Sequence, residues 1–323
     1  MKINIPDITK QIDKEDVIEV FVNNYRSIGT IWVVHQMEWS NRIYSMFKDH
    51  DKAIILIYLI RKTLGFYSRN FIKLSFEEFY GQKSVKVGKF NIIDISKNLS
   101  IPKESARRKL IELEKNNIIK SNINKKKDTN IIFDGQSFPN IIPNDSINKI
   151  SNFLSLFSKL LVDKKILPNV LSSVELKKVI EKNFTYIWKI YYDMQISMMT
   201  TYKKVFTDLE VWHIFGTCVV NQHLYSKNID KTKIDRMEFI KDLYSNDKVL
   251  GLNAMSISDI TGIPRATVVR KLKKLLKLKF LIINNKKHYK ASGNLIKKLL
   301  PLQSTVISQL ANFSTKVYNL AIL

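Results

Sequence analysis

The chain has 323 residues, a formal net charge of +24, 45% hydrophobic residues, nine glycines and seven prolines. This composition excludes a disordered or fibrous protein and predicts about two globular domains built mainly from long helices. The single cysteine, Cys218, excludes a disulfide framework within the chain and a cysteine-based metal site, and it indicates a reducing compartment.

The start of the chain contains no apolar segment of the kind that forms a signal peptide. The longest apolar run, positions 53–60, is far shorter than the roughly 20 residues needed to cross a membrane. We therefore expect a cytoplasmic protein with no membrane partner.

Hydrophobic spacings of three and four residues predict a mainly helical chain in which one order of elements occurs twice. In the first half we expect one long or broken helix over residues 17–47, helices over 53–66 and 76–80, two short helices and a strand within 92–122, a wing strand over 130–133 and a helix over 147–161. In the second half we expect helices over residues 171–206 and 208–225, a copy of the short helices and strands within 257–290, and a helix over 306–320 after Pro301. Asp51 is the expected N-cap of the helix over 53–66.

The clearest sign of duplication is a stretch of the first half, beginning at Ile101, that recurs without a gap from Ile263. The aligned residues are Ile101-Pro102 with Ile263-Pro264, Arg108-Lys109-Leu110 with Arg270-Lys271-Leu272, and Leu113 with Leu275. Such a repeat predicts two copies of one module. We place them at residues 15–166 and 167–323, because Pro168 separates two helical patterns.

Positive charge is concentrated on the two copies of this stretch. Residues 97–127 contain ten Lys and Arg against three acids, and residues 259–290 contain ten against one. This distribution is typical of proteins that bind a polyanion, because neutralised phosphates release counterions. Charge alone leaves open a solvated lysine-rich surface.

Within each copy, the pattern predicts a short apolar helix, a tight turn and a second helix that starts at the proline. Gly262 suits a left-handed residue at the corner. At 100° per residue, one stripe of each second helix faces inward: Ala106, Leu110 and Leu113, and Val268, Leu272 and Leu275. The opposite face carries Glu104, Arg108, Ile111 and Lys115 in one copy, and Ala266, Arg270, Lys273 and Lys277 in the other.

A helix of this kind fits the DNA major groove, where arginine pairs with guanine and the residues near the helix start reach the bases. The candidate base readers are Lys103, Glu104, Ser105, Arg108, Arg265, Thr267 and Arg270. The candidate phosphate contacts are Lys109, Lys271, Lys273 and Lys274, and Arg107 belongs to the same DNA-binding set. At the hairpin tips, Lys125, Lys126, Lys127, Lys286, Lys287 and His288 are expected to follow the backbone or enter the minor groove.

The sequence IPRATVVRKL at residues 263–272 resembles the winged helix-turn-helix regulators of the MarR-like type. The resemblance covers residues 92–133 and 257–289 and is only architectural elsewhere. Members of that family pair through helices from both chain ends and use one recognition helix for each half-site. The resemblance therefore implies that the two modules form an intramolecular pseudo-dimer. Because Glu104 aligns with Ala266, the copies have diverged and we expect two unequal half-sites.

The sequence contains no catalytic signature, and its five histidines are scattered, so we expect no enzyme, metal site or cofactor. Aromatic residues in the long helices form either a core or a pocket for a small-molecule effector: Trp32, Trp39, Trp188, Tyr191, Tyr192 and Trp212. The predicted function is a sequence-specific regulator of transcription that binds double-stranded DNA. A plasmid-type replication initiator and a protein-interaction scaffold remain as alternatives, and so does further pairing into a homodimer.

Overall fold

The computed structural model describes residues 9, 11–122, 127–133, 141–226, 236–245 and 249–323. Within these residues the chain is mainly helical with small antiparallel sheets, as the sequence predicts. The first half contains α1 (Lys14–Asn23), the π-helix η2 (Tyr25–Gly29), α2 (Thr30–Phe47), α3 (His50–Arg69), α4 (Phe76–Tyr80), β1 (Ser84–Val87), α5 (Ile92–Leu99), α6 (Lys103–Lys115), β2 (Ile119–Asn122), β3 (Lys127–Ile132) and α7 (Asn144–Asp163). The second half contains α8 (Ser173–Lys182), α9 (Phe184–Phe206), α10 (Leu209–Ser226), α11 (Arg236–Ser245), α12 (Ala254–Thr261), α13 (Arg265–Lys277), β4 (Leu281–Ile283), β5 (Tyr289–Ala291), η4 (Gly293–Leu295) and α14 (Ile296–Ala321).

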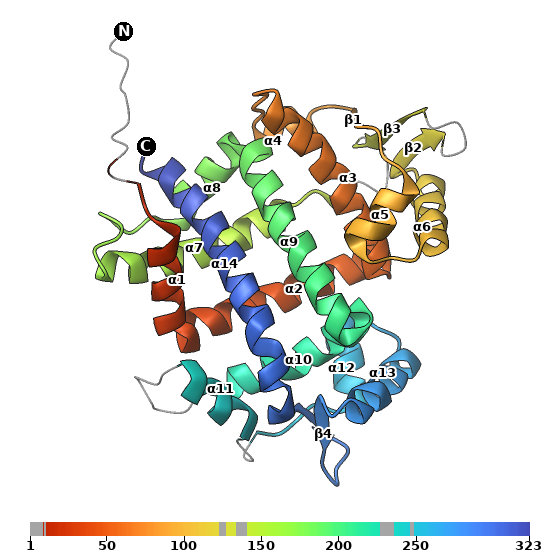
Figure 1. The fold of residues 1–323 in the computed structure, drawn as a ribbon, viewed down its shortest axis with the longest axis vertical. Helices are drawn as coiled ribbons and strands as arrows, with labels where there is room; N and C mark the ends of the chain where they lie inside the picture. The colour runs from red at the N-terminus through yellow and green to blue at the C-terminus, as the bar shows by residue number, and fades with distance from the viewer. Residues whose placement is uncertain (1–8, 10, 123–126, 134–140, 227–235, 246–248) are drawn as a thin grey trace.

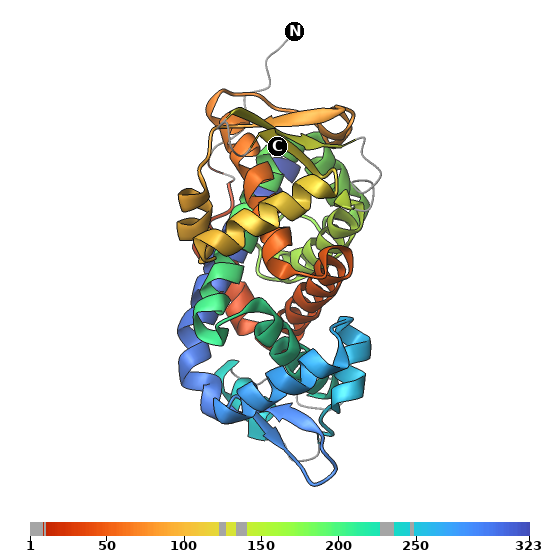
Figure 2. The same cartoon turned by 90° about the vertical axis from the view of Figure 1, so that its right-hand side faces the viewer.

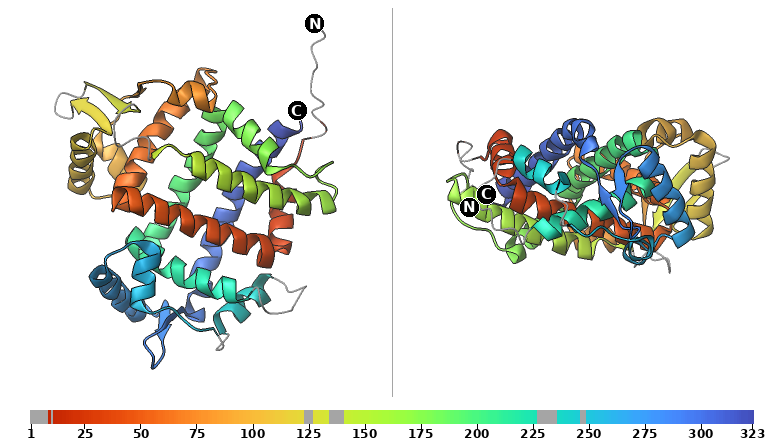
Figure 3. Two further views of the ribbon diagram at one scale, coloured as in Figure 1. Left: turned by 180° about the vertical axis from the view of Figure 1, so that it is seen from behind. Right: turned by 90° about the horizontal axis from the view of Figure 1, so that it is seen from below.

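The long helices form two crossed layers (Figures 1 and 3). Helices α3, α9 and α14 lie side by side in one layer, and α7, α2 and α10 cross them in the other. One continuous core of buried apolar side chains joins the layers, and Trp188, Tyr191 and Tyr318 are among its largest fully buried members. These layers hold α5, α6, α12 and α13 along one edge of the molecule (Figure 1).

The helices repeat along the chain with a nearly constant separation. Helix α8 begins as far after α1 as α10 begins after α3. Helices α12 and α13 follow α5 and α6 at a common separation that is slightly larger, so the second copy has a short insertion between α10 and α12. This agreement in element order extends the repeat well beyond the stretch whose sequence recurs. Two residues are called equivalent below when they are as far apart in sequence as the starts of α1 and α8. For residues of the short helices, the separation between the starts of α5 and α12 is used instead.

Each copy follows its second short helix with antiparallel strands. In the first copy β3 lies between β1 and β2, with Val85 paired to Ile131 and Ile119 paired to the same residue. In the second copy β4 pairs with β5, and Leu252 forms a single bridge to Tyr289 at the place that β1 takes in the first copy. Both copies thus run helix, strand or bridge, two short helices, and a strand pair.

The two halves also exchange contacts reciprocally. Helix α1 packs on α14, and the equivalent α8 packs on α7. The Ile12 N–H donates to Asn319 Oδ1 at 2.8 Å, and Asn319 Nδ2 donates to the Ile12 carbonyl at 3.2 Å. The helices nearest the two chain ends are therefore bound together, while the division into two modules near residue 166 stays a prediction.

Residues 17–47 form a broken helix, one of the two forms that the pattern predicts, and the break is η2, where the Gly29 backbone lies against the Tyr25 ring. Two other predicted element boundaries were wrong. Asp49, not Asp51, caps α3, because its Oδ1 accepts from the Asp51 and Lys52 backbone N–H groups. Helix α14 begins before Pro301 and continues through it, because the proline removes only one backbone donor from a helix whose apolar side is buried along its length.

Candidate nucleic-acid interface

The corner between the paired short helices has the same backbone conformation in both copies. Gly262 follows α12 with φ of +68°, as its residue type predicts, and Ser100 follows α5 with φ of +51°. The prolines differ slightly from the prediction, since Pro102 and Pro264 are the N-cap residues of α6 and α13, one position before the first helical residue. Their fixed φ still directs the chain into the second helix.

The inward faces of α6 and α13 are as the helical spacing predicts. Ala106, Leu110 and Leu113 are buried, and so are the equivalent Val268, Leu272 and Leu275. The outward residues of each helix are exposed or half-buried: Glu104, Arg108, Ile111 and Lys115 on α6, and Ala266, Arg270, Lys273 and Lys277 on α13. Both helices therefore fix one side in the core and present the other to solvent.

One lysine of each helix is held by an acid at the start of a neighbouring long helix. The Lys109 ammonium binds the Asp49 carboxylate at the start of α3, and its side chain is only 9% exposed. The equivalent Lys271 binds Asp208 at 2.7 Å and Glu210 at 3.3 Å, and its side chain is 12% exposed. Asp208 also accepts from the Val211 N–H at the start of α10. Lys109 and Lys271, which we expected to contact phosphate, thus lie in ion pairs inside the protein.

These two acids were missed in the sequence. Asp49 and Asp208 are equivalent residues, because each directly precedes its long helix, α3 or α10. A search for acids at the separation of these helices would have found them, but the spacing gives no sign that each faces a lysine in a later element. The repeated pair anchors α6 to α3 and α13 to α10 in the same manner.

The remaining candidates on the two helices are accessible to different degrees. The exposed ones are Lys103, Glu104, Arg107, Arg108, Arg265 and Arg270, together with Lys273, and the half-buried ones are Ser105, Thr267 and Lys274. Lys274 donates to Thr207 Oγ1 and lies 3.9 Å from Asp208. Figure 2 shows α6 and α13 on the same side of the molecule, with the three-stranded sheet beyond α6 and the β4–β5 hairpin beyond α13. Helices α6 and α13 consequently lie on one side of the molecule.

The tip of the β4–β5 hairpin is basic. Lys286 and Lys287 are exposed there and His288 is half-buried. Asn284 Oδ1 accepts from the Lys286 and His288 backbone N–H groups, each at 3.0 Å, which orders the turn. In the first copy, Lys125 and Lys126 lie outside the described residues. Lys127 begins β3, and its side chain lies outside the described part as well.

The two helices differ in charge. On α6, Glu112 binds Lys52 at 3.1 Å and lies 3.9 Å from Arg108. The residue at the equivalent place on α13 is Lys274. Helix α13 therefore presents a more basic surface than α6.

Two histidines meet where α3 and α10 approach each other. The His50 and His213 rings lie 5.1 Å apart edge to face, and His213 Nε2 is 2.7 Å from Asn41 Oδ1. Burial lowers the pKa of His50 to about 3, and the nearby Lys271 acts in the same direction. Burial also lowers the pKa of His213 well below its ordinary value. Both rings are neutral at pH 7, so the junction between the two anchored helices carries no net charge from histidine.

The described residues contain no group of three His, Cys, Asp or Glu side chains placed to hold a metal ion. Burial raises the pKa of the Cys218 thiol to about 12, in keeping with a packing role. None of the helices in the described part combines the length and apolar character that crossing a membrane requires. No protein-family model, curated protein or solved structure matches the chain. Function must therefore be inferred from the arrangement of these residues.

Proposed function

We propose that the protein binds double-stranded DNA through two tandem winged helix-turn-helix modules, which form a pseudo-dimer within one chain and regulate transcription. The observation that carries this proposal is the pairing of α6 and α13. They are equivalent in the repeat, are anchored by the same kind of ion pair, carry exposed basic residues and lie on one side of the molecule. Binding to two successive major grooves on one side of a duplex requires two helices of this kind.

The local geometry supports the assignment of recognition helices. Arg108 and Arg270 are exposed and occupy equivalent outward positions near the middle of α6 and α13. Arginine at such a place can donate two hydrogen bonds to guanine. The buried stripe and the anchoring lysine restrain each helix, which keeps its outward side chains in a fixed orientation for a partner.

Phosphate contacts are proposed from the exposed lysines and the wing. Lys273 on α13 and Lys286 and Lys287 at the hairpin tip are exposed cations around the recognition helix. Lys109 and Lys271 are left out of this set, because their ammonium groups are bound to carboxylates. Since α13 is more basic than α6, the second module is proposed to contribute more of the binding that does not depend on sequence.

The decisive experiment is selection of bound fragments from random duplex DNA, followed by anisotropy titrations of the selected duplex at several salt concentrations. We expect two half-sites about 10–10.5 bp apart from centre to centre. With six to ten phosphate contacts, affinity should fall on the order of 10³–10⁵-fold between 50 and 200 mM salt.

A matched surface control is Lys182→Ala at the end of α8, a helix that packs against α7 and α14 away from the proposed face. It should leave the titration unchanged, whereas Lys273→Ala should weaken binding at low salt. The DNA-binding proposal is abandoned if the full chain retains no duplex at about 50 mM salt, where phosphate contacts bind strongly. Binding that is insensitive to salt would contradict the assigned phosphate contacts.

A further inference from the structure

Two cavities between the crossed helices of the described part lie at equivalent places of the repeat. One is lined by Phe206, Phe215 and Val219 among others, and the second is lined by their equivalents in the first copy, Phe47, Leu56 and Ile60. We call the first the Gln36 cavity and the second the Arg42 cavity, after a polar side chain that lines each. Because both copies have a cavity at this place, the cavity results from the repeated packing of the helices. The side chains that differ between the two cavities then determine what each could bind.

The two cavities differ in charge. In the Arg42 cavity, Arg42 and Asp145 both line the space and are bound to each other. Among the described residues that line the Gln36 cavity there is no Asp, Glu, Lys or Arg. Its histidine, His223, is buried with Nδ1 2.9 Å from Thr30 Oγ1. A charged molecule in the Gln36 cavity would thus lose its hydration without contacting an oppositely charged lining residue, which selects for a neutral occupant. The nearby Arg236 guanidinium does not line the space, and it is held against two lining residues, the Tyr25 ring and Gln303 Oε1.

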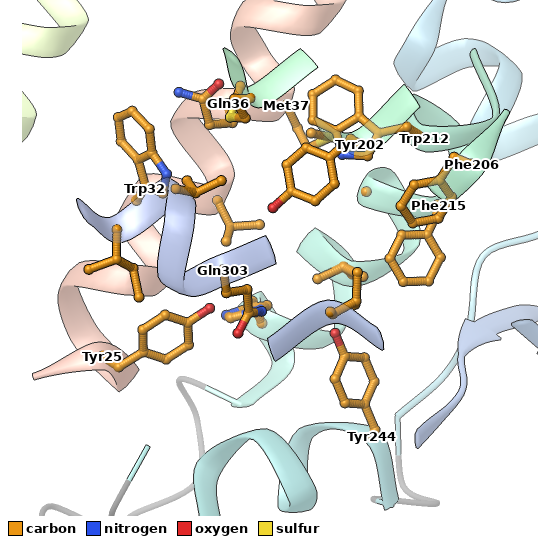
Figure 4. A pocket seen from close by; sticks show the side chains of 18 of the residues that line it. Tyr25, Trp32, Gln36, Met37, Tyr202, Phe206, Trp212, Phe215, Tyr244 and Gln303 are labelled. Carbon is orange, nitrogen blue, oxygen red and sulfur yellow. The ribbon is translucent and has the colours of Figure 1, made fainter. Parts of the chain in front are cut away.

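Aromatic rings form a large part of the walls of the Gln36 cavity (Figure 4). Tyr202, Trp212, Phe206 and Phe215 lie along one side, and Tyr25 and Tyr244 lie at the other end. Tyr202 and Trp212 stack with ring centroids 5.3 Å apart. Rings arranged in this way favour a flat aromatic occupant, which can stack on one face and meet the edges of the others.

The Gln36 side-chain amide is a buried polar group at this cavity that lacks hydrogen bonds. Its side chain lines the cavity and is 4% exposed, and neither Oε1 nor Nε2 has a hydrogen-bond partner in the described part of the chain. An unpaired buried amide is costly, and the amide offers one acceptor and two donors. A molecule that carries both a donor and an acceptor on one planar group would satisfy it.

Gly216 and the flexible side chains of Met37 and Met198 allow the cavity to change its shape. A Cβ at Gly216 would overlap Met37 Sδ and lie 2.8 Å from Met37 Cε, so the missing side chain at Gly216 is what lets Met37 pack there. The residue at the equivalent place in the Arg42 cavity is Ile57. The Gln36 cavity has a volume of about 80 Å³, about half of the roughly 150 Å³ that holds benzene in an engineered apolar cavity. An occupant as large as one substituted ring therefore fits only if Met37 and Met198 shift and enlarge the space.

From these observations we propose that the Gln36 cavity binds a small neutral molecule made of one aromatic ring and an amide-like group. The ring packs among the aromatic side chains, and the polar group exchanges hydrogen bonds with the Gln36 amide. This site is separate from the proposed DNA-binding face, and testing it requires no DNA.

The test uses the full chain with benzamide as the probe and benzoate, of nearly the same shape but negatively charged, as its control. Calorimetry and quenching of tryptophan fluorescence are suitable, since Trp32 and Trp212 both line the cavity. We expect benzamide to bind at least tenfold more tightly than benzoate. Gln36→Leu should weaken benzamide binding about tenfold, and Gly216→Ala should abolish it by pushing Met37 into the space.

Gln195→Leu is the matched control, because Gln195 is the equivalent of Gln36 in the second copy and is also buried, yet it does not line the Gln36 cavity. It should leave benzamide binding unchanged, and thermal melts should show that all three variants fold. Gln36→Leu replaces an unpaired amide by an apolar group, so a melting temperature equal to or above the parent is expected. The proposal is overturned if benzamide does not bind at millimolar concentration, if benzoate binds equally well, or if Gln36→Leu and Gln195→Leu have the same effect.

Discussion

The assignment of Lys109 as an anchor rather than a phosphate contact can be tested with Lys109→Met. Methionine keeps the apolar stem of the side chain but leaves the Asp49 carboxylate without its cation. Breaking a fully buried ion pair in this way costs about 3–5 kcal/mol. Asp49 is 27% exposed and keeps its bonds to two backbone N–H groups, so solvent screening reduces the expected cost to about 1–2 kcal/mol. The melting temperature should fall on the order of 2–5 °C.

The assay compares thermal melts with the salt dependence of duplex binding for Lys109→Met and for Lys273→Ala. An anchor changes the melt and leaves the slope of log affinity against log salt unchanged. A phosphate contact does the reverse, lowering the slope by about 0.9 while changing stability by less than about 0.5 kcal/mol. Asp49→Asn removes the charge and keeps a good N-cap, so the double variant should cost less than the two single variants together. A lower slope with an unchanged melt for Lys109→Met would refute the anchoring role.

Three other predictions follow from the same structure. Replacing Arg108 or Arg270 by alanine should each cost roughly 1–3 kcal/mol of DNA binding and relax preference at one half-site, and unchanged affinity and preference would exclude base reading. Because the pKa of His50 is lowered to about 3 in the folded protein, the unfolded chain binds the proton first, so stability is complete above about pH 6.5 and falls by up to about 1.4 kcal/mol per unit as pH decreases toward 3. Melts of His50→Leu against pH should be flatter, and parallel curves would disprove this. Gly262→Ser should destabilise by about 1 kcal/mol, and Ser100→Gly should stabilise by a similar amount, because both sites have positive φ; denaturant titrations that show the opposite signs would be inconsistent with left-handed corners.

Helices α6 and α13 and their buried faces were predictable from the sequence because their signal is local. Burial of Leu110 and Leu272 follows from a helical period that can be counted within one short helix. The roles of Lys109 and Lys271 were not predictable in the same way. Both lysines lie between the buried and exposed faces of their helices. Each ammonium group is bound by an acid that is far away in the sequence, and this ion pair determines the role of the lysine.

The aromatic residues show a second limit. Apolar side chains at helical spacing look alike in sequence whether they fill a core or surround a space. Trp39, Trp188, Tyr191 and Tyr192 line the Arg42 cavity, whereas Trp32 and Trp212 line the Gln36 cavity. Gln36 and its equivalent Gln195 both have unpaired amides, but of the two only Gln36 lines one of these cavities, and this difference becomes visible only when the neighbouring helices are in place.

The joining of the two copies in one chain has a consequence for how their surfaces can change. In an assembly of two identical chains, every substitution occurs twice, and a residue that improves one half must be tolerated in the other. Here both copies belong to one chain, and Ile12, just before α1, is bound to Asn319 of α14, so this contact does not depend on the concentration of the protein. A substitution in one copy therefore occurs once, and the two copies carry different residues at equivalent places, such as the glutamate at position 112 and the lysine at position 274.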